Sequence, residues 1–314
     1  MSDALRALAP ANSNDLREGG RWTRRQAAKN LVLFHLARLA LAALGRLPRS
    51  SLLRLGRGLG ALCHGLLRGE RRRAEANVEL ALPDLSPDDR RALVARCFRA
   101  LGAHLADAVA LSSERTVAAL PFEPGSLELL EEARREGRGV LFASAHLGPW
   151  ERVAASIVRA GVPLVTLARE AYDPRLTRVL VALRERHGVR AIFRGGAGAA
   201  LAIVRALRGG AVLGAPMDLA SRVPSVVATF LGVPARTALG PARIALRTGS
   251  AVVVGSYAAG GVVRVTRVPL ADLAATPQDE VRLTERINAE LSLRILETPE
   301  DWPWMHRRFV GEDS

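Results

Sequence analysis

From about Gly139 onward, short apolar runs alternate with amphipathic segments, and this alternation constrains the fold more than any other feature of the chain. Short apolar runs bounded by turn residues are typical of buried strands, whereas longer stretches with apolar residues every three or four positions are typical of helices. Strands that alternate with helices pair in parallel through helical crossovers. The sequence therefore predicts an α/β fold with a mixed, largely parallel sheet flanked by helices.

The predicted elements follow one another closely. Strands are expected at 139–145, 162–168, 189–193, 211–215, 251–257 and 262–268. Helices are expected at 149–160, 174–187, 197–208 and 279–297. The chain before about residue 120 is predicted to be helical, with a clear helix start at Ser86, because Ser86 can cap the helix and Pro87 suits its first position.

The N-terminal region predicts helices that associate with a membrane. Residues 31–45 are apolar apart from His35 and Arg38, but this run of about 15 residues is shorter than the roughly 20 that span a bilayer. Residues 52–67 are rich in Leu and Gly with interspersed Arg. Both segments could lie on a membrane or cap the core of the protein, and the sequence leaves both interpretations open. Basic residues beside them favour contact with an anionic membrane surface.

The formal net charge of the 314-residue chain is +14, which favours anionic partners such as nucleic acid, acidic phospholipid or an acidic carrier protein. Lys29 is the only lysine, so the positive charge comes from arginines spread along the whole chain. Aromatic residues make up only 4%, which argues against a stacking platform for nucleic acid, and we expect no nucleic-acid partner. Cys63 and Cys97 have neither paired nor metal-ligand spacing and are predicted to be buried thiols.

A polar side chain follows each of the first four predicted strands of the α/β region. These residues are His146, Arg169, Arg194 and Asp218. In open α/β sheets, ligands bind outside the carboxyl ends of the strands. Four such residues at successive strand ends are more informative than any one of them, and they predict a functional site at this edge of the sheet.

His146 and Glu151 form the most specific element of this edge. They are five residues apart, so they would not share a face of one continuous helix. They can meet if the strand ends at His146, the chain turns at Gly148, and a helix starts at Pro149. A carboxylate in the first helical turn could then hold one imidazole nitrogen and leave the other free to accept a proton.

Competing chemistries have weaker support. The chain has no Gly-x-Ser-x-Gly nucleophile motif, and Gly195-Gly196-Ala197-Gly198 lacks a full nucleotide-binding fingerprint. No group of His, Cys, Asp and Glu has metal-ligand spacing. We therefore expect direct attack by a substrate hydroxyl with His146 as general base, with neither a metal nor a cofactor.

Several motifs in order resemble the bacterial lipid A late acyltransferases, the lauroyl/myristoyl branch of the lysophospholipid acyltransferase superfamily. The resemblance runs from about Arg71 to Phe309, and the His-x4-acid motif at His146 and Glu151 is its most specific part. The other matching segments are Arg71-Arg72-Arg73 with Asn77 and Leu82-Pro83, Arg169 with Asp173-Pro174, Arg184 and Arg186 with Gly188, Asp218, Phe230-Leu231-Gly232 with Thr237, Gly240-Pro241 and Ala245, and the tail from Pro299 to Phe309. The chain departs from the family at Glu170 and at Asp173. It also departs at Pro216, a position where many relatives carry a second acid.

The resemblance implies a glycerolphosphate-acyltransferase-like fold and transfer of a fatty acyl group from acyl carrier protein or acyl-CoA to a phosphorylated glycolipid acceptor, a lipid A precursor. It implies that His146 is the base, that Glu151 orients it, and that Asp218 positions the substrate or is a second partner of His146. Arg169, and with it Arg186 and Arg194, would bind phosphate. The expected location is the cytoplasmic face of the inner membrane.

The expected organisation is a polar tail at 1–28, membrane-associated helices at 29–68 and an acyltransferase domain at 69–314. Two alternatives remain within lipid chemistry: an acyltransferase for another glycolipid, a mannoside or a lysophospholipid, and a non-catalytic protein that binds anionic lipid. The first would acylate a different acceptor. The second would bind lipid without consuming a thioester.

Overall fold

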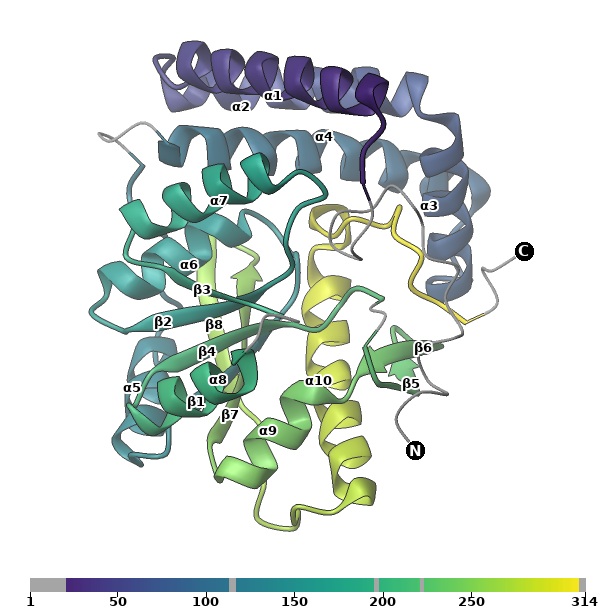
Figure 1. Cartoon of the computed structure of the whole chain (residues 1–314). Coiled ribbons are helices and arrows are strands. Elements are labelled where there is room, and N and C mark those ends of the chain that lie inside the picture. Colours follow the sequence, from purple (N-terminus) through teal and green to yellow (C-terminus); the bar gives the residue numbers. More distant parts are fainter. Residues whose placement is uncertain (1–20, 113–116, 195–197, 221–222, 311–314) are drawn as a thin grey trace.

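The computed structural model describes residues 21–112, 117–194, 198–220 and 223–310. The strands of its central sheet are β1 (Val140–Ser144), β2 (Leu164–Ala168), β3 (Arg190–Phe193), β4 (Val212–Pro216), β7 (Ala251–Ala258) and β8 (Val262–Arg267). Their order is β3-β2-β4-β1-β7-β8, and every neighbouring pair is parallel except β7 with β8. The prediction of an α/β fold with a mixed, largely parallel sheet is confirmed (Figure 1).

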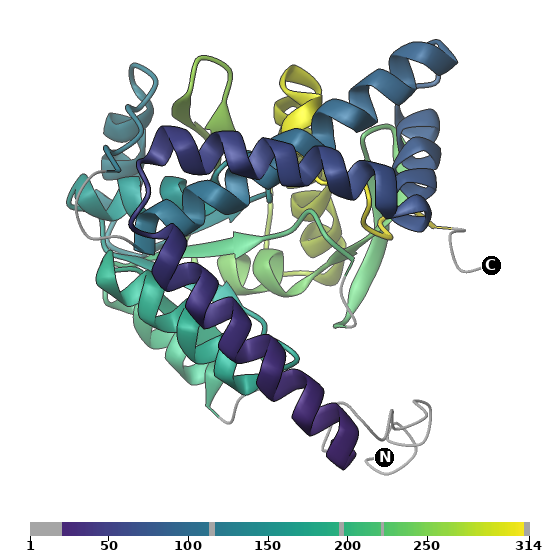
Figure 2. The ribbon, with the colours of Figure 1, turned by 90° about the horizontal axis from the view of Figure 1, so that it is seen from above.

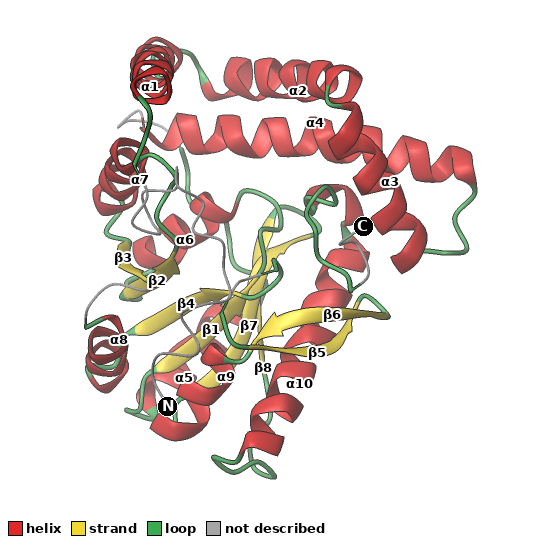
Figure 3. Ribbon diagram, turned by 45° about the vertical axis from the view of Figure 1, so that its right-hand side comes forward, coloured by secondary structure: helices red, strands yellow, loops and turns green. Residues whose placement is uncertain are grey.

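Helices cover both faces of this sheet (Figure 3). They are α5 (Ser126–Arg135), α6 (Trp150–Arg159), α7 (Pro174–Arg186), α8 (Ala199–Arg208), α9 (Gly240–Thr248) and α10 (Pro277–Glu297). Successive side chains of a strand point to opposite faces, so each face buries its own core. In β1, Leu141 and Ala143 pack with α8, α9 and α10, whereas Val140 and Phe142 pack with α5 and α6.

The N-terminal region is helical, as expected, with α1 (Arg24–Leu44), α2 (Arg49–Leu66), α3 (Arg68–Ala81) and α4 (Pro87–Ser112). Helices α1 and α2 lie on the outside of the molecule, above α4 (Figure 2). Helix α2 approaches α4 closely because glycines face each other: a Cβ on Gly56 would lie 2.3 Å from the carbonyl oxygen of Gly102. Any side chain there would push the two helices apart.

Helix α1 is longer than the sequence suggested. Its 21 residues are long and apolar enough to cross a membrane, and they rise about 31 Å, close to the thickness of a bilayer's hydrocarbon core. The apolar run at 31–45 covers only part of this helix. The helix begins earlier, at Arg24, directly after the Thr23 cap. Cys63 on α2 is exposed, which corrects the prediction that it is buried, whereas Cys97 is buried.

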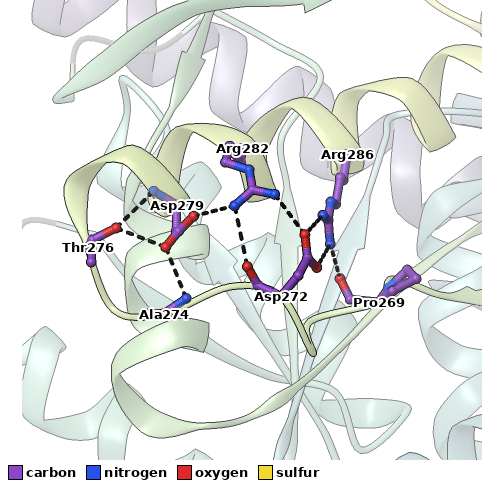
Figure 4. A network of polar contacts seen from close by, with 7 residues as sticks. All are labelled: Pro269, Asp272, Ala274, Thr276, Asp279, Arg282 and Arg286. Atoms are coloured by element: carbon purple, nitrogen blue, oxygen red, sulfur yellow. Dashed lines mark hydrogen bonds and ion pairs between the residues drawn. The ribbon is translucent and has the colours of Figure 1, made fainter.

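Helix α5, helix α9 and one β-hairpin had no counterpart among the predicted elements. The antiparallel hairpin of β5 (Ser225–Phe230) and β6 (Val233–Ala238) packs against α10, as does α9. Figure 4 shows how the loop before α10 is tied to that helix: the Asp272 carboxylate accepts from Arg282 at 2.7 Å and from Arg286 at 2.5 Å. These groups are exposed to solvent, so the ion pairs stabilise the loop only weakly.

The chain then returns to the sheet. After the 3-10 turn η2 (Pro299–Asp301), Trp302 and Trp304 are fully buried between the N-terminal helices and the sheet. Of the polar tail predicted at 1–28, residues 1–20 lie outside the described residues. The division into membrane-associated helices and an acyltransferase domain stays a prediction.

Candidate active site

Strand register brings together two of the predicted site residues that are 72 positions apart in sequence. Strands β1 and β4 are parallel neighbours, and their last paired residues are Ser144 and Pro216. His146 and Asp218 each stand two residues beyond that pair, so they occupy equivalent positions at the same edge of the sheet. The two side chains therefore face each other without any local sequence signal that links them.

The Asp218 carboxylate holds His146 at two points. The Nδ1 atom of His146 lies 3.0 Å from Oδ1, and the backbone N–H of His146 donates to Oδ2 at 2.9 Å. The Asp218 side chain is fully buried, whereas 29% of the His146 side chain is exposed. Because the carboxylate can only accept, Nδ1 carries the proton and Nε2 is the basic nitrogen. Within the described chain, Nε2 makes no hydrogen bond to another residue.

Nearby charges make the imidazole a stronger base. Burial lowers the pKa of His146 and is the largest single influence. The Asp218 carboxylate acts in the opposite direction through its charge and its hydrogen bond, and Glu151 adds a second negative charge, so the pKa rises above its ordinary 6.5. The same pairing lowers the pKa of Asp218 against the opposing effect of its burial, so this carboxylate stays ionised.

Glu151 lies in the first turn of α6, as predicted, but its carboxylate has a different partner. It pairs with Arg184 of α7, Oε1 with Nη2 at 2.6 Å and Oε2 with Nε at 3.0 Å. This bidentate pair is largely buried, with 12% of the Glu151 and 21% of the Arg184 side chain exposed. The nitrogen of His146 that was expected to bond Glu151 bonds Asp218 instead.

The turn between His146 and α6 requires glycine for two reasons. Gly148 has a φ of +62°, in the left-handed region that side chains disfavour. A Cβ at this position would also lie 2.4 Å from the ring of Tyr257. The Gly148 N–H donates to the carbonyl oxygen of Asp301 at 3.0 Å, so the C-terminal segment fixes the turn as well.

Arg169 and Arg194 are a second pair brought together by strand register. They directly follow Ala168 and Phe193, which are paired residues at the ends of β2 and β3. The pKa of Arg194 is lowered, first by desolvation of its guanidinium and second by the positive charge of Arg169. Two guanidinium groups held near each other favour an anionic ligand between or beside them.

A cavity of about 740 Å³ joins these arginines to His146. Its lining includes Arg169, Arg184, Arg194 and His146, together with apolar residues of α8 and α9. A smaller and mainly apolar pocket of about 80 Å³ lies between the sheet and α6, and it is lined by Phe142, Val153, Ile157, Leu164, Gly214 and Gly255 among others. His146 lines both cavities and therefore lies where they meet.

Arg186 is not among the residues that line either cavity. Its guanidinium donates to the carbonyl oxygen of Ser112 at 2.9 Å, and it lines a separate cavity with Leu111, Arg159 and His187. The helix period explains this placement: Arg184 and Arg186 are two residues apart on α7, so they point to different sides.

Two residues near His146 were not recognised as site residues. Arg184 was noted only as part of a basic segment, and its role as the partner of Glu151 follows from the packing of α7 on α6. The indole Nε1 of Trp302 donates to Asp218 Oδ2 at 2.9 Å. Its place in a Trp-rich tail was the only signal for it in the sequence.

Comparisons with known proteins identify the family of the chain. A family model described as "Bacterial lipid A biosynthesis acyltransferase" matches residues 22–310. The chain belongs to this family. It is 27% identical over 286 residues to the "Lipid A biosynthesis palmitoleoyltransferase" of Escherichia coli (strain K12) and to the "Lipid A biosynthesis acyltransferase" of Shigella flexneri. Each match covers 86% of this chain and 89% of the relative.

The resemblance noted in the sequence is therefore confirmed, and the chain is an acyltransferase of the lipid A biosynthesis family. Together with the apolar helix α1, family membership indicates association with a membrane. In this lipid A acyltransferase family member, the imidazole of His146 lies between an arginine-lined cavity and an apolar pocket.

Proposed function

We propose that this protein transfers a fatty acyl group from an acyl thioester, carried by acyl carrier protein or coenzyme A, to a hydroxyl group of a phosphorylated lipid A precursor. The hydroxyl can belong to the glycan or to an acyl chain already attached. The observation that carries this proposal is the position of His146 at the junction of an arginine-lined cavity and an apolar pocket. Acyl transfer to a phosphorylated lipid needs a base, an anion site and an apolar site in contact.

In the proposed reaction, Nε2 of His146 removes the proton of the acceptor hydroxyl as its oxygen attacks the thioester carbonyl. The C–O bond forms, and the carbonyl becomes a tetrahedral oxyanion. When this intermediate collapses, the C–S bond breaks and the thiolate takes the proton from the imidazolium. Asp218 holds Nδ1 and stabilises the imidazolium formed in between.

Arg169 and Arg194 are proposed to bind a phosphate of the acceptor or of the donor's phosphopantetheine. The pair of Glu151 and Arg184 lies beside His146 on the wall shared with the apolar pocket. That pocket is proposed to receive the fatty tail. Gly255 helps to shape its floor, since a Cβ there would lie 2.0 Å from the ring of Phe142.

The proposed location is the cytoplasmic face of the inner membrane. Helix α1 exposes leucines along its length, and α2 exposes Leu55, Leu59, Leu62 and Leu66, which recur three to four residues apart and so form one apolar stripe. Arginines beside these helices would meet anionic headgroups. The net charge of +14 suits an acidic carrier protein as donor.

The decisive experiment uses the purified full-length protein in detergent or membranes, with labelled acyl carrier protein or acyl-CoA and a lipid A precursor. His146→Ala is expected to lower turnover by about 10²–10⁴-fold while thermal unfolding is unchanged. His35→Ala, on the exposed side of α1, is the matched control and should retain activity. Retained turnover in His146→Ala would refute the proposal, and lipid binding without thioester consumption by the unmodified protein would favour the binding-protein alternative.

The arginine cavity can be tested with a matched pair of variants. Arg169→Ala is expected to raise KM for the phosphorylated substrate by about 10- to 100-fold, because a charge-assisted contact is lost. Arg186→Ala should leave KM unchanged, since Arg186 lines a different cavity. Mass spectrometry of the lipid that gains an acyl chain distinguishes a lipid A precursor from another glycolipid or a lysophospholipid.

A further inference from the structure

The C-terminal segment reaches the same carboxylate that holds His146. The Nε1–H of Trp302 donates to Asp218 Oδ2 at 2.9 Å, and both side chains are fully buried. Oδ2 also accepts from the backbone of His146, while Oδ1 accepts from its ring. The carboxylate is thus held by three donors, and Trp302 supplies the only one of the three that does not come from His146 itself.

The indole is itself fixed by its surroundings. Cys97 of α4 donates through Sγ to the Trp302 carbonyl oxygen at 3.0 Å. The Trp302 ring packs edge-on against Trp304, with ring centroids 4.9 Å apart, and against Phe230 of the hairpin at 5.8 Å. Asn77 of α3 holds the Trp304 carbonyl oxygen at 2.8 Å. An indole packed from several sides has one available direction for its N–H.

The same segment also holds the other side of the catalytic loop. The carbonyl oxygen of Asp301 accepts from the backbone N–H of Gly148. The side-chain carboxylate of Asp301 lies 2.8 Å from Nε2 of His104 on α4. Residues 301 and 302 therefore contact both the turn that follows His146 and the acid that holds its ring.

We propose that Trp302 is a positioning residue of the acyl-transfer site, whose indole N–H fixes the rotation of the Asp218 carboxylate and thereby the direction of the basic nitrogen of His146. This inference rests on the proposed function, in which His146 is the general base. Trp302 lines neither cavity, so it acts through Asp218 and does not contact the substrate.

Two consequences follow from removing this N–H. The carboxylate can rotate, so the imidazole spends less time in the reactive orientation and kcat falls, while KM for both substrates is unchanged. The negative charge of Asp218 is also shared with one donor fewer, so it acts more strongly on His146 and raises the imidazole pKa. The other titratable groups near this pair remain: Glu151 and Arg184 at His146, and His306 and Arg308 of the tail.

The test compares Trp302→Phe with Trp304→Phe in the full-length protein. Both substitutions remove a buried indole, but the Nε1–H of Trp304 donates to the carbonyl oxygen of Pro299 and not to Asp218. Trp302→Phe is expected to lower kcat by about 10- to 100-fold and to move the acidic limb of the kcat/KM profile to higher pH by about half a unit. Trp304→Phe should leave the position of that limb unchanged.

If Trp302→Phe fails to fold, replacement of Trp302 by 3-benzothienylalanine keeps the ring and substitutes sulfur for the N–H alone. The expected shift of the acidic limb is the same. An unchanged kcat and acidic limb in either variant would overturn the inference, as would an equal shift in Trp304→Phe. His146→Ala, measured in parallel, separates the two proposals: its retained activity would refute the proposed base, whereas its inactivity beside an unaffected Trp302 variant would refute only the role of Trp302.

Discussion

Two carboxylates approach His146 from different regions of the molecule, the first turn of α6 and the end of β4. Glu151 is five residues away in sequence, yet it makes a bidentate pair with Arg184. Asp218 is 72 residues away, yet it bonds both the ring and the backbone of His146. In this chain, the acid of the His-x4-acid motif shares a pocket with the histidine, whereas the acid that bonds the imidazole is brought there by strand register.

The largest expected effect comes from the distant acid. Asp218→Asn keeps the size of the side chain, but one of its two acceptor oxygens becomes an amide NH₂ group, which cannot accept from a donor. The imidazole of His146 is then no longer held in the tautomer that carries its proton on Nδ1. We expect kcat to fall by about 10³- to 10⁴-fold, since replacing the orienting acid of a catalytic triad by its amide costs about 10⁴-fold. Steady-state kinetics with a labelled thioester donor measures it. A loss of less than tenfold would show that Asp218 does not orient the base.

A smaller effect is expected from the nearby acid. Glu151→Gln removes the charge that pairs with Arg184 while keeping an oxygen that can accept from it. We expect kcat to fall by about tenfold and the free energy of unfolding by about 1–3 kcal/mol, because a largely buried guanidinium loses its counter-charge. Thermal unfolding and kinetics measure both. If Glu151→Gln were as inactive as Asp218→Asn with unchanged stability, Glu151 would be the orienting acid.

The pH dependence of activity is the finest test of the comparison. The base must be neutral, and its pKa is raised, so kcat/KM of the unmodified enzyme should rise with pH through a midpoint above 6.5. Loss of the Asp218 charge leaves burial as the dominant influence, so Asp218→Asn should move this midpoint to lower pH. Glu151→Gln should move it in the same direction by less. A larger shift for Glu151→Gln would reverse the order of the two carboxylates.

Much of the fold followed from local patterns. The strands of the central sheet and helices α6, α7 and α8 were predictable because their apolar periods are regular, and the start of α4 was predictable from Ser86 and Pro87. Helix α9 was not predicted. The hairpin of β5 and β6 was not, because its buried positions include Ala and Thr and its strands are stabilised by packing on α10 and on the C-terminal segment. The length of α1 depended on capping by Thr23, outside the apolar run.

Local sequence patterns were enough to predict the class of the fold, the motif at His146 and the edge of the sheet that carries the candidate site, because periodicity and the residues after each strand can be read without the tertiary structure. Long-range packing was needed to bring Asp218 to His146, Glu151 to Arg184, and Trp302 to Asp218. The first pairing depends on the register of β1 and β4, the second on the packing of α7 against α6, and the third on the return of the C-terminal segment to the sheet. Sequence distance carries no information about any of them.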